Sequence, residues 1–284
     1  MSSELNPQKQ TETAHQNVQS VAISPLKYQW YLWLLALSFF TRIPVKLPTH
    51  LSNEMLSDML HHASRYFALV GFVIGLSSAA VYFFAQIIFP EHISIIMTMT
   101  FGLLLTGAFH EDGWADVWDG FGGGWSLEQK LNIMKDSRLG TYGASALFFI
   151  LLIKFFSLYE LADYSNGLPI IALVVAHTIS RVVATSLIAD MPYVAEDATS
   201  KVKPLAQQLS ANGLLCLLAT GLVVALLCLP WVVVVKLTIV LLITRSLIKL
   251  WFNKQLGGYT GDCLGAAQQL TEVVIYLSFI VWFT

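Results

Sequence analysis

Long apolar runs separated by short polar connections dominate the pattern of this chain. Each run approaches the ~20 residues that a helix needs to cross about 30 Å of hydrocarbon. The predicted fold class is therefore all-α, a polytopic transmembrane helical bundle. We expect seven spans, near residues 65–89, 93–109, 142–161, 168–188, 213–229, 231–252 and 264–283.

Two N-terminal segments depart from this pattern. Residues 28–40 are apolar but number only 13 between Lys27 and Arg42, which is more typical of a short interfacial or re-entrant helix than of a span. Residues 1–24 are rich in Gln, Ser, Thr and Glu, and they lack the basic start and apolar centre of a cleaved signal peptide. We predict a disordered polar tail over 1–24 and a single integral-membrane domain over 25–284.

Composition supports a membrane protein and excludes other classes. Hydrophobic residues make up 56% of the 284 positions, whereas soluble domains have roughly 45–50% apolar residues. The formal net charge is -2 and no basic run is present, so nucleic acid is not expected as a partner. The three cysteines lack metal-ligand spacing, so neither disulfides nor a thiolate metal site is expected.

Basic residues alternate between the two ends of the predicted helices. Lys and Arg occur in the connections 42–65, 111–141, 190–204 and 249–263, but not in those near Pro90, 163–169 and Pro230. By the positive-inside rule, the basic connections face the cytoplasm.

The stretch HEDGWADVWDGFGGG, residues 110–124, concentrates acid in an otherwise apolar chain. Asp112, Asp116 and Asp119 have i, i+4, i+7 spacing. A helix continuing from the 93–109 span would carry them on one stripe at the membrane edge, with Glu111 beside it. Carboxylates at this spacing repel one another, and clustered oxygen ligands are typical of Mg²⁺ or Mn²⁺ sites that also hold substrate phosphates.

The following stretch, IMKDSRLGTYG (133–143), supplies groups suited to phosphate binding. Lys135, Ser137 and Arg138 offer donors to phosphate oxygens, and Asp136 either completes the metal shell or orients Lys135. A solvated acidic loop is the alternative for an isolated acidic run. Acids and bases in one predicted cytoplasmic loop instead favour a catalytic metal site that holds a diphosphate.

The stretch GGYTGDCLGA (257–266) opens the last predicted span. There Gly258 and Gly261 would let an anion approach the amides of a helix N-terminus. Asp262 would repel a phosphate, so it is assigned to a metal or sugar contact or to helix capping.

Three further residues are candidates for substrate binding. Arg181 lies inside an apolar run, which favours a phosphate or carboxylate partner. Arg42 suits either a substrate phosphate or interfacial anchoring. His110 is either a proton acceptor or a polar helix end.

Aspartate-rich metal sites in membrane enzymes serve two reactions, attack of an alcohol on a nucleotide diphosphate and prenyl transfer from a prenyl diphosphate. In both, the metal neutralises the leaving phosphate. The first also gains from a carboxylate that accepts the alcohol's proton. The acidic motif alone does not separate them.

Three polar motifs together carry a family resemblance: GAFHEDGWADVWDGFGGGW, LNIMKDSRLGTYGASAL and LGGYTGDCLGA, with LSFFTRIPV (37–45) as a matching opening. In order and spacing they resemble the cobalamin synthase family, the adenosylcobinamide-GDP ribazoletransferases of the bacterial inner membrane. The resemblance covers nearly the whole chain after the tail. Cys263 stands where the family commonly has Thr, which removes one hydroxyl from the third motif.

The resemblance implies a transferase of adenosylcobalamin biosynthesis. The 5′-hydroxyl of α-ribazole, or the 5′-phosphate derivative of α-ribazole in its place, attacks the phosphate of adenosylcobinamide-GDP nearest the corrinoid, and GMP leaves. It implies Mg²⁺ as the cofactor, a multi-pass location in the inner membrane with the site facing the cytoplasm, and either a homo-oligomer or a complex with other cobalamin-assembly enzymes. The expected metal ligands are Glu111, Asp112, Asp116 and Asp119. Asp116 or Asp119 would double as the base.

Three rival classes fit less well. A CDP-alcohol phosphotransferase shares the acidic motif but usually has an Ala-Arg pair where this chain reads VWDGFGGG. A prenyltransferase would repeat its aspartate motif, which the 190–204 loop copies poorly. A membrane transporter would more commonly place its acids at mid-span in broken helices.

Overall fold

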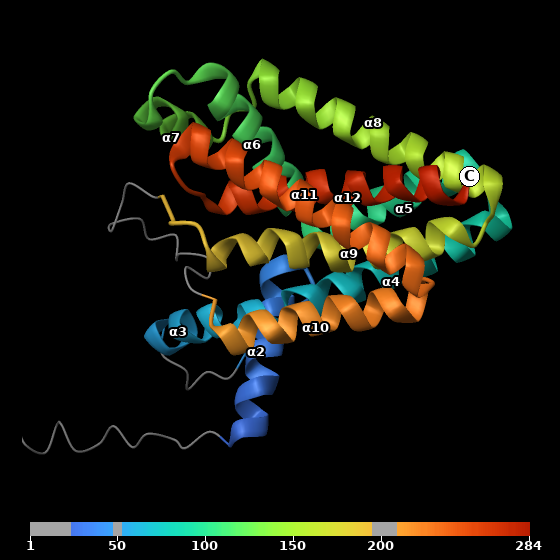
Figure 1. The fold of residues 1–284 in the computed structure, drawn as a ribbon, viewed down its shortest axis with the longest axis horizontal. Coiled ribbons are helices and arrows are strands. Elements are labelled where there is room, and N and C mark those ends of the chain that lie inside the picture. The colour runs from blue at the N-terminus through green and yellow to red at the C-terminus, as the bar shows by residue number, and fades with distance from the viewer. Residues whose placement is uncertain (1–23, 48–52, 195–208) are drawn as a thin grey trace, which may run out of the picture.

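The structure is a computed structural model that describes residues 24–47, 53–194 and 209–284. Within these residues the chain is helical, apart from one bridge between Tyr193 and Tyr259. Figure 1 shows the long helices side by side in a bundle, with α2 running crosswise to them. The helices are α2 (Pro25–Phe40), α3 (Asn53–Ala63), α4 (Phe67–Ile88), α5 (Glu91–Thr106), α6 (Phe109–Gly123), α7 (Leu127–Lys135), α8 (Thr141–Tyr164), α9 (Leu168–Ser186), α10 (Ala211–Cys228), α11 (Trp231–Leu256) and α12 (Gly261–Phe283), with short 3-10 turns η1 (Ser64–Tyr66) and η2 (Leu187–Ala189).

Length and composition qualify six helical segments of this part of the chain as membrane spans, and a seventh if α5 and α6 are counted as one bent span. The six are Asp58–Ile88, Thr141–Tyr164, Leu168–Ala189, Ala211–Cys228, Trp231–Leu256 and Gly261–Phe283. Pro90 and Pro230 precede α5 and α11 as N-cap residues, where proline starts a new helix and cannot extend the one before it. The predicted multi-pass all-α class is confirmed. Residues 1–23 of the predicted tail and residues 195–204 of the predicted loop lie outside the described residues.

Helix α9 lies at the centre of the bundle. Its apolar window is 83% buried and that of α12 is 67% buried, whereas the windows of α8, α10 and α11 are only 22–28% buried. Glycines of α4 allow it to approach α9 closely: a Cβ atom at Gly71 would lie 2.2 Å from the carbonyl oxygen of His177, and one at Gly75 would lie 2.7 Å from that of Leu173. Small residues at such contacts are how membrane helices gain packing energy.

The expectation that the second span continues straight into the acidic motif is wrong. Helix α5 ends at Thr106, and Gly107 and Ala108 both adopt left-handed backbone angles, with φ of 67° and 57°. Helix α6 then leaves at an angle of 87° to α5. A left-handed glycine after the last helical residue is a common way to end a helix. The acidic motif therefore starts inside the bundle and runs outward to one end (Figure 1).

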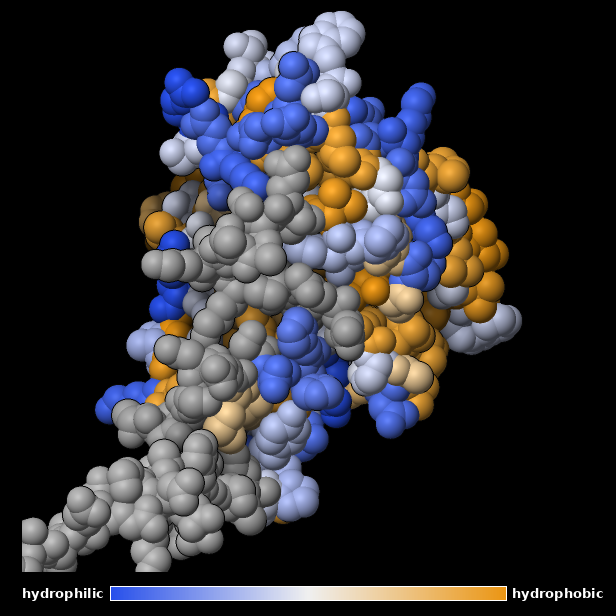
Figure 2. Space-filling model, turned by 90° about the vertical axis from the view of Figure 1, so that its left-hand side faces the viewer, coloured by the Kyte–Doolittle hydropathy of each residue, from blue (hydrophilic) through white to orange (hydrophobic). Residues whose placement is uncertain are grey.

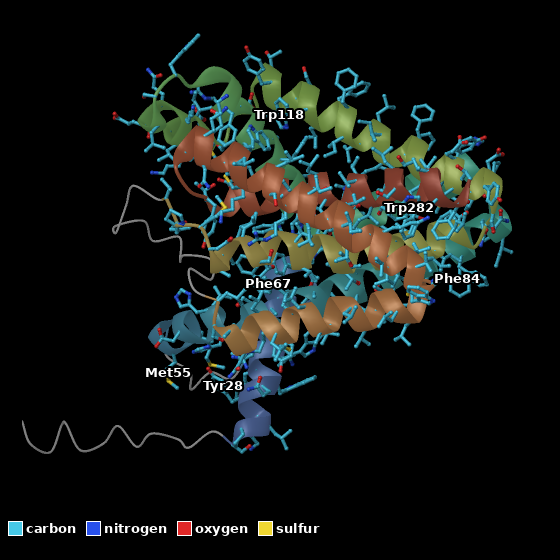
Figure 3. The ribbon with its side chains drawn as sticks, in the orientation of Figure 1. Tyr28, Met55, Phe67, Phe84, Trp118 and Trp282 are labelled. Atoms are coloured by element: carbon cyan, nitrogen blue, oxygen red, sulfur yellow. The ribbon has the colours of Figure 1, made fainter. Side chains whose placement is uncertain are left out.

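One end of the bundle collects the polar segments. Figure 1 places α3, the α6–α7 connection and the start of α12 at this end. Figure 2 looks onto it and shows hydrophilic side chains gathered over the surface. Helix α2 is anchored nearby by aromatic packing, since the ring centroid of Phe40 lies 4.5 Å from that of Phe67, which is labelled in Figure 3. With 16 residues and a crosswise direction, α2 fits the predicted interfacial or re-entrant helix.

Candidate active site

The acidic motif forms a helix whose aspartates are buried to different degrees. On α6, Asp112 is exposed, Asp116 is half-buried and Asp119 is buried. All three carry like charge on one helix, and Asp116 is within electrostatic reach of Asp112, Asp119 and Asp262. The predicted stripe thus exists, although it does not extend straight from the preceding span.

Asp119 holds the start of α8. Its two carboxylate oxygens accept hydrogen bonds from the amides of Gly140 and Gly143, at 2.7 and 2.8 Å. A negative charge at a helix N-terminus satisfies amides that have no partner in the helix and interacts favourably with the helix dipole. Side chains at these glycines would collide with the carboxylate, since each added Cβ would lie within 2.4 Å of an Asp119 oxygen. Asp119 therefore ties the acidic helix to the predicted phosphate-binding motif.

Asp262 reaches the acidic face from the other side. At the closest approach of α6 and α12, a Cβ atom added at Gly113 would lie 2.8 Å from the carbonyl oxygen of Asp262. Asp262 is partly buried, and its carboxylate lies within electrostatic reach of Asp112. Helix capping falls to Thr260, whose hydroxyl accepts from the amide of Cys263 at 3.3 Å. The Asp262 carboxylate also interacts with the side chain of Thr260.

The glycine-rich turn before α12 is held by a short backbone pairing. The amide of Tyr259 donates to the carbonyl of Pro192 at 3.0 Å, and the amide of Val194 donates to the carbonyl of Tyr259 at 2.8 Å. Gly258 is packed so closely that a Cβ would lie 2.3 Å from the Pro192 oxygen, whereas a Cβ at Gly261 would meet no atom within 4 Å. Burial raises the pKa of Tyr259 to about 12. Of the two predicted glycines, Gly258 is needed for packing and Gly261 leaves open space.

The predicted phosphate-binding residues follow the C-terminus of α7. Asp136 caps α7 and pairs with the exposed Arg138, with 2.5 Å between Oδ2 and Nη2. Hydrogen bonds from Arg138 lower the pKa of Asp136 below its ordinary value. Lys135 and Ser137 are also exposed at this end. Asp136 thus orients Arg138, and this pair is open to solvent.

A buried polar cluster lies deeper in the bundle, and sequence reasoning missed most of it. Lys154 of α8 lies 3.0 Å from Glu272 of α12 and 3.9 Å from Glu111 of α6. Gln269 donates to Glu111 at 2.9 Å, and Tyr276 donates to Glu272 at 3.0 Å. Glu111 therefore points into the bundle, away from the Asp112–Asp116–Asp119 stripe. The sequence signal for Lys154 and Glu272 was that each is a lone ionisable residue within an apolar run, which indicates a paired or functional role.

Arg181 and His110 link this cluster to the base of α2. The Arg181 guanidinium lies over the ring of Phe40, 5.9 Å from its centroid, and donates to the carbonyl of His177 at 2.8 Å. Its Nε atom is buried without a hydrogen-bond partner among the described residues. His110 stacks on Phe40 with 5.3 Å between ring centroids. Both residues line two adjoining cavities, one of which reaches the open turn at Gly261.

The larger polar cavity of this pair has a volume of about 40 Å³. It is lined by side chains of the buried cluster, including Glu111, Lys154, Arg181 and Glu272. A cavity of this size with several polar partners has room for a few waters. Arg42 lies outside it, at the α5–α6 break, where its Nε atom would be 2.3 Å from a Cβ at Gly107.

The acidic face carries carboxylates of the kind that bind divalent cations. Asp112, Asp116 and Asp262 have no Lys or Arg ion-pair partner in the described part of the chain. Carboxylate oxygens with no protein cation are the ligands that Mg²⁺ takes. In their present rotamers, no three His, Cys, Asp or Glu side chains of the described residues stand close enough to hold a metal. The ligand set Glu111, Asp112, Asp116 and Asp119 stays a prediction.

Comparison with known proteins agrees with this geometry. The family model described as cobalamin-5-phosphate synthase matches residues 32–280. The chain is 54% identical over 249 residues to the adenosylcobinamide-GDP ribazoletransferase of Shewanella frigidimarina, covering 88% of this chain and 94% of that protein. It is 48% identical over 258 residues to the protein of the same name from Vibrio parahaemolyticus, covering 91% and 95%. No solved structure matches the chain.

Proposed function

The chain belongs to the cobalamin-5-phosphate synthase family, and from this premise we infer that it is an adenosylcobinamide-GDP ribazoletransferase of cobalamin biosynthesis. The observation that carries the chemistry is the meeting of two acidic segments. Asp112 and Asp116 of α6 lie beside Asp262 where α6 and α12 touch at Gly113. The three carboxylates belong to two motifs far apart in the sequence, so the fold alone brings them together.

The proposed reaction is a displacement at phosphorus. A free ribose hydroxyl oxygen of α-ribazole, or of its 5′-phosphate, forms a bond to the phosphate nearest the corrinoid. The bond from that phosphate to the bridging oxygen of GMP breaks, and GMP leaves with the electron pair. The hydroxyl proton passes to a carboxylate of the acidic face. We assign it to Asp116, because both oxygens of Asp119 already accept backbone amides.

Asp112, Asp116 and Asp262 would hold Mg²⁺, which when bound supplies positive charge to the leaving phosphate. Asp119 acts on the substrate through α8, by fixing the amides of Gly140 and Gly143 relative to α6. Glu111 faces Lys154 and Gln269, so it supports α6 from inside the bundle.

Several groups surround the acidic face with donors for the substrate's phosphates. The open backbone at Gly261 starts α12, and a helix N-terminus favours anions. Lys135, Ser137 and Arg138 lie exposed at the same end of the bundle. Arg181 and His110 line the cavity that reaches Gly261, and Arg42 lies at the α5–α6 break. These residues are the proposed substrate-binding set.

The polar end of the bundle is proposed to face the cytoplasm of a bacterial inner membrane. Basic residues of its described connections include Arg42, Lys130, Arg138 and Lys254, whereas the opposite end at Pro90 and Pro230 has none. A site at the membrane edge would suit a corrinoid substrate that is large and amphipathic. A homo-oligomer or a complex with other assembly enzymes remains a prediction.

Purified protein in lipid, supplied with Mg²⁺, α-ribazole and adenosylcobinamide-GDP, tests this function. We expect GMP release in a one-to-one ratio with the corrinoid product, and loss of both when EDTA is added. Turnover of a CDP-activated lipid, without reaction of the corrinoid, would instead identify a CDP-alcohol phosphotransferase. Movement of substrate across vesicles without bond cleavage would identify a transporter.

A further inference from the structure

A third cavity lies between α9, α10 and α11. It has a volume of about 290 Å³. Its lining is apolar except for Gly221, Ser186, Thr238 and Arg245. The floor is formed where α10 crosses α9, since a Cβ at Gly221 would lie 2.8 Å from the side chain of Val182. This groove shares no lining residue with the cavities around the acidic face.

The groove opens to the surface that faces lipid. Helices α10 and α11 are the most exposed of the spans along with α8, and apolar residues beside the groove are strongly exposed, such as Leu222 at 53% and Leu242 at 59%. In a span, such side chains contact acyl chains rather than water. The occupant of the groove must therefore be apolar along most of its length.

The mouth of the groove is charged. Arg245 donates to Ser186 at 2.8 Å and to Asp190 at 2.6 Å, and Lys249 donates to Asp190 at 2.7 Å. Although burial alone would raise it, the hydrogen bonds from Arg245 and Lys249 bring the pKa of Asp190 below its ordinary value. Two cations on one carboxylate leave a net charge of +1 at the mouth. Asp190 directly follows the span Leu168–Ala189, so this charge lies where the span leaves the membrane.

We propose that this groove binds one anionic phospholipid, with an acyl chain along the apolar lining and the headgroup phosphate at Arg245 and Lys249. An apolar channel that ends in uncompensated positive charge at a membrane edge is complementary to a lipid with an anionic headgroup. Neither end of such a lipid would leave polar atoms unpaired, because the phosphate oxygens accept from the guanidinium and ammonium groups.

The bound lipid would stabilise the turn before α12. Asp190 is followed by Met191, and then by Pro192, whose carbonyl accepts from Tyr259 in the turn that positions Asp262. A headgroup that fixes Arg245 and Lys249 fixes Asp190 and, through it, this pairing. Tyr193 pairs with Tyr259. Asp190 of the lipid site lies three residues before Tyr193, and Asp262 of the acidic face lies three residues after Tyr259.

Native mass spectrometry of the delipidated full-length chain, with phosphatidylglycerol or phosphatidylcholine added at equal concentration, tests the proposal. Wild type should retain one phosphatidylglycerol per chain. It should prefer phosphatidylglycerol over phosphatidylcholine roughly fivefold, because this is the size of the attraction between one basic residue and an anionic headgroup. Lys249→Gln should reduce that preference to about one. Lys236→Gln, on the same helix outside the mouth, should leave the preference at the wild-type value.

Filling the groove provides a second measurement. Thr238 lines it and is exposed, so Thr238→Trp should fold, as shown by an unchanged elution volume, and should abolish retention of both lipids. Ile239→Trp, at the next exposed position but outside the lining, should retain them. Lipid retention by Thr238→Trp would overturn the proposal. So would a wild-type dimer that Thr238→Trp dissociates, because the groove would then be an interface between two copies.

Discussion

The Nζ atom of Lys154 lies 3.0 Å from Oε1 of Glu272, and the two side chains are only 6% and 4% exposed. The lysine belongs to α8 and the glutamate to α12, both spans of the bundle. Charges at this depth are costly unless they are paired, and Tyr276 and Gln268 complete the hydrogen bonding of Glu272. The pair fixes the position of α12, and with it Asp262, relative to the helix that Asp119 holds.

Glu272→Gln should destabilise the protein strongly, because it leaves the buried Lys154 ammonium without its closest counter-charge. Removing one partner of a buried pair costs about 3–5 kcal/mol, which corresponds to a fall of roughly 6–20 °C in Tm for a chain of this size. Tryptophan fluorescence during heating in detergent would measure it. Glu160→Gln, on the exposed surface of α8, is the matched control. Equal Tm values for the two variants would show that the pair contributes nothing.

Asp116→Asn and Asp262→Asn should each lower kcat/KM by about 100-fold or more, since several kcal/mol of charge stabilisation depend on the bound metal. Both should also raise the Mg²⁺ concentration needed for half-maximal GMP release. Asp163→Asn, at the opposite end of α8, should behave as wild type. Full turnover by Asp116→Asn would refute its role as ligand and base.

Asp119→Asn should act through the backbone rather than the metal. An amide offers one acceptor oxygen where the carboxylate offers two, so the amide of Gly140 or Gly143 loses its partner. A hydrogen bond to a charged group contributes about 1.5–3 kcal/mol. Hydrogen exchange should therefore speed up across residues 140–144, whereas Asp116→Asn should leave exchange there unchanged. Unaltered exchange in Asp119→Asn would favour a direct metal contact for Asp119.

Sequence patterns predicted the spans well because the membrane imposes a length and a hydrophobicity on each helix. They also located the acidic and basic motifs. They could not show that Asp119 caps α8, since that contact joins residues 21 and 24 positions apart. Nor could they show that Glu111 and Asp112, neighbours in sequence, face different environments, because this depends on the direction in which α6 leaves α5.

The break between α5 and α6 had a weak local signal. Gly107 follows an apolar run, where a glycine often ends a helix, but no proline follows it, and the polar residues begin only at His110. The Lys154–Glu272 pair had a clearer one, since each is an isolated ionisable residue in an apolar run. The sequence shows each residue as an unusual charge in an apolar run. Only the packing of α8 against α12 shows that the two residues pair with each other.

Gly113→Ala should lower activity without removing any functional group. The added methyl would lie 2.8 Å from the Asp262 carbonyl oxygen, so α6 and α12 would have to separate, at a cost of about 1–3 kcal/mol. Gly123→Ala, on the same helix, meets its nearest atom at 3.4 Å and should be nearly neutral. A comparison of GMP release and Tm for the two variants would measure the effect, and equal activity would show that the close approach is dispensable.

Helix α5 has 16 residues and is therefore about 24 Å long, less than the ~30 Å of a typical hydrocarbon core. The carbonyl groups at its end need hydrogen-bond donors, and Arg42 supplies one through its amide, which donates to Leu105 at 2.7 Å. We expect the bilayer beside α5 to become thinner, so that water and headgroups reach the Gly107 turn. Hydrophobic mismatch of this kind makes the enzyme sensitive to acyl-chain length and favours membranes of short-chain lipids.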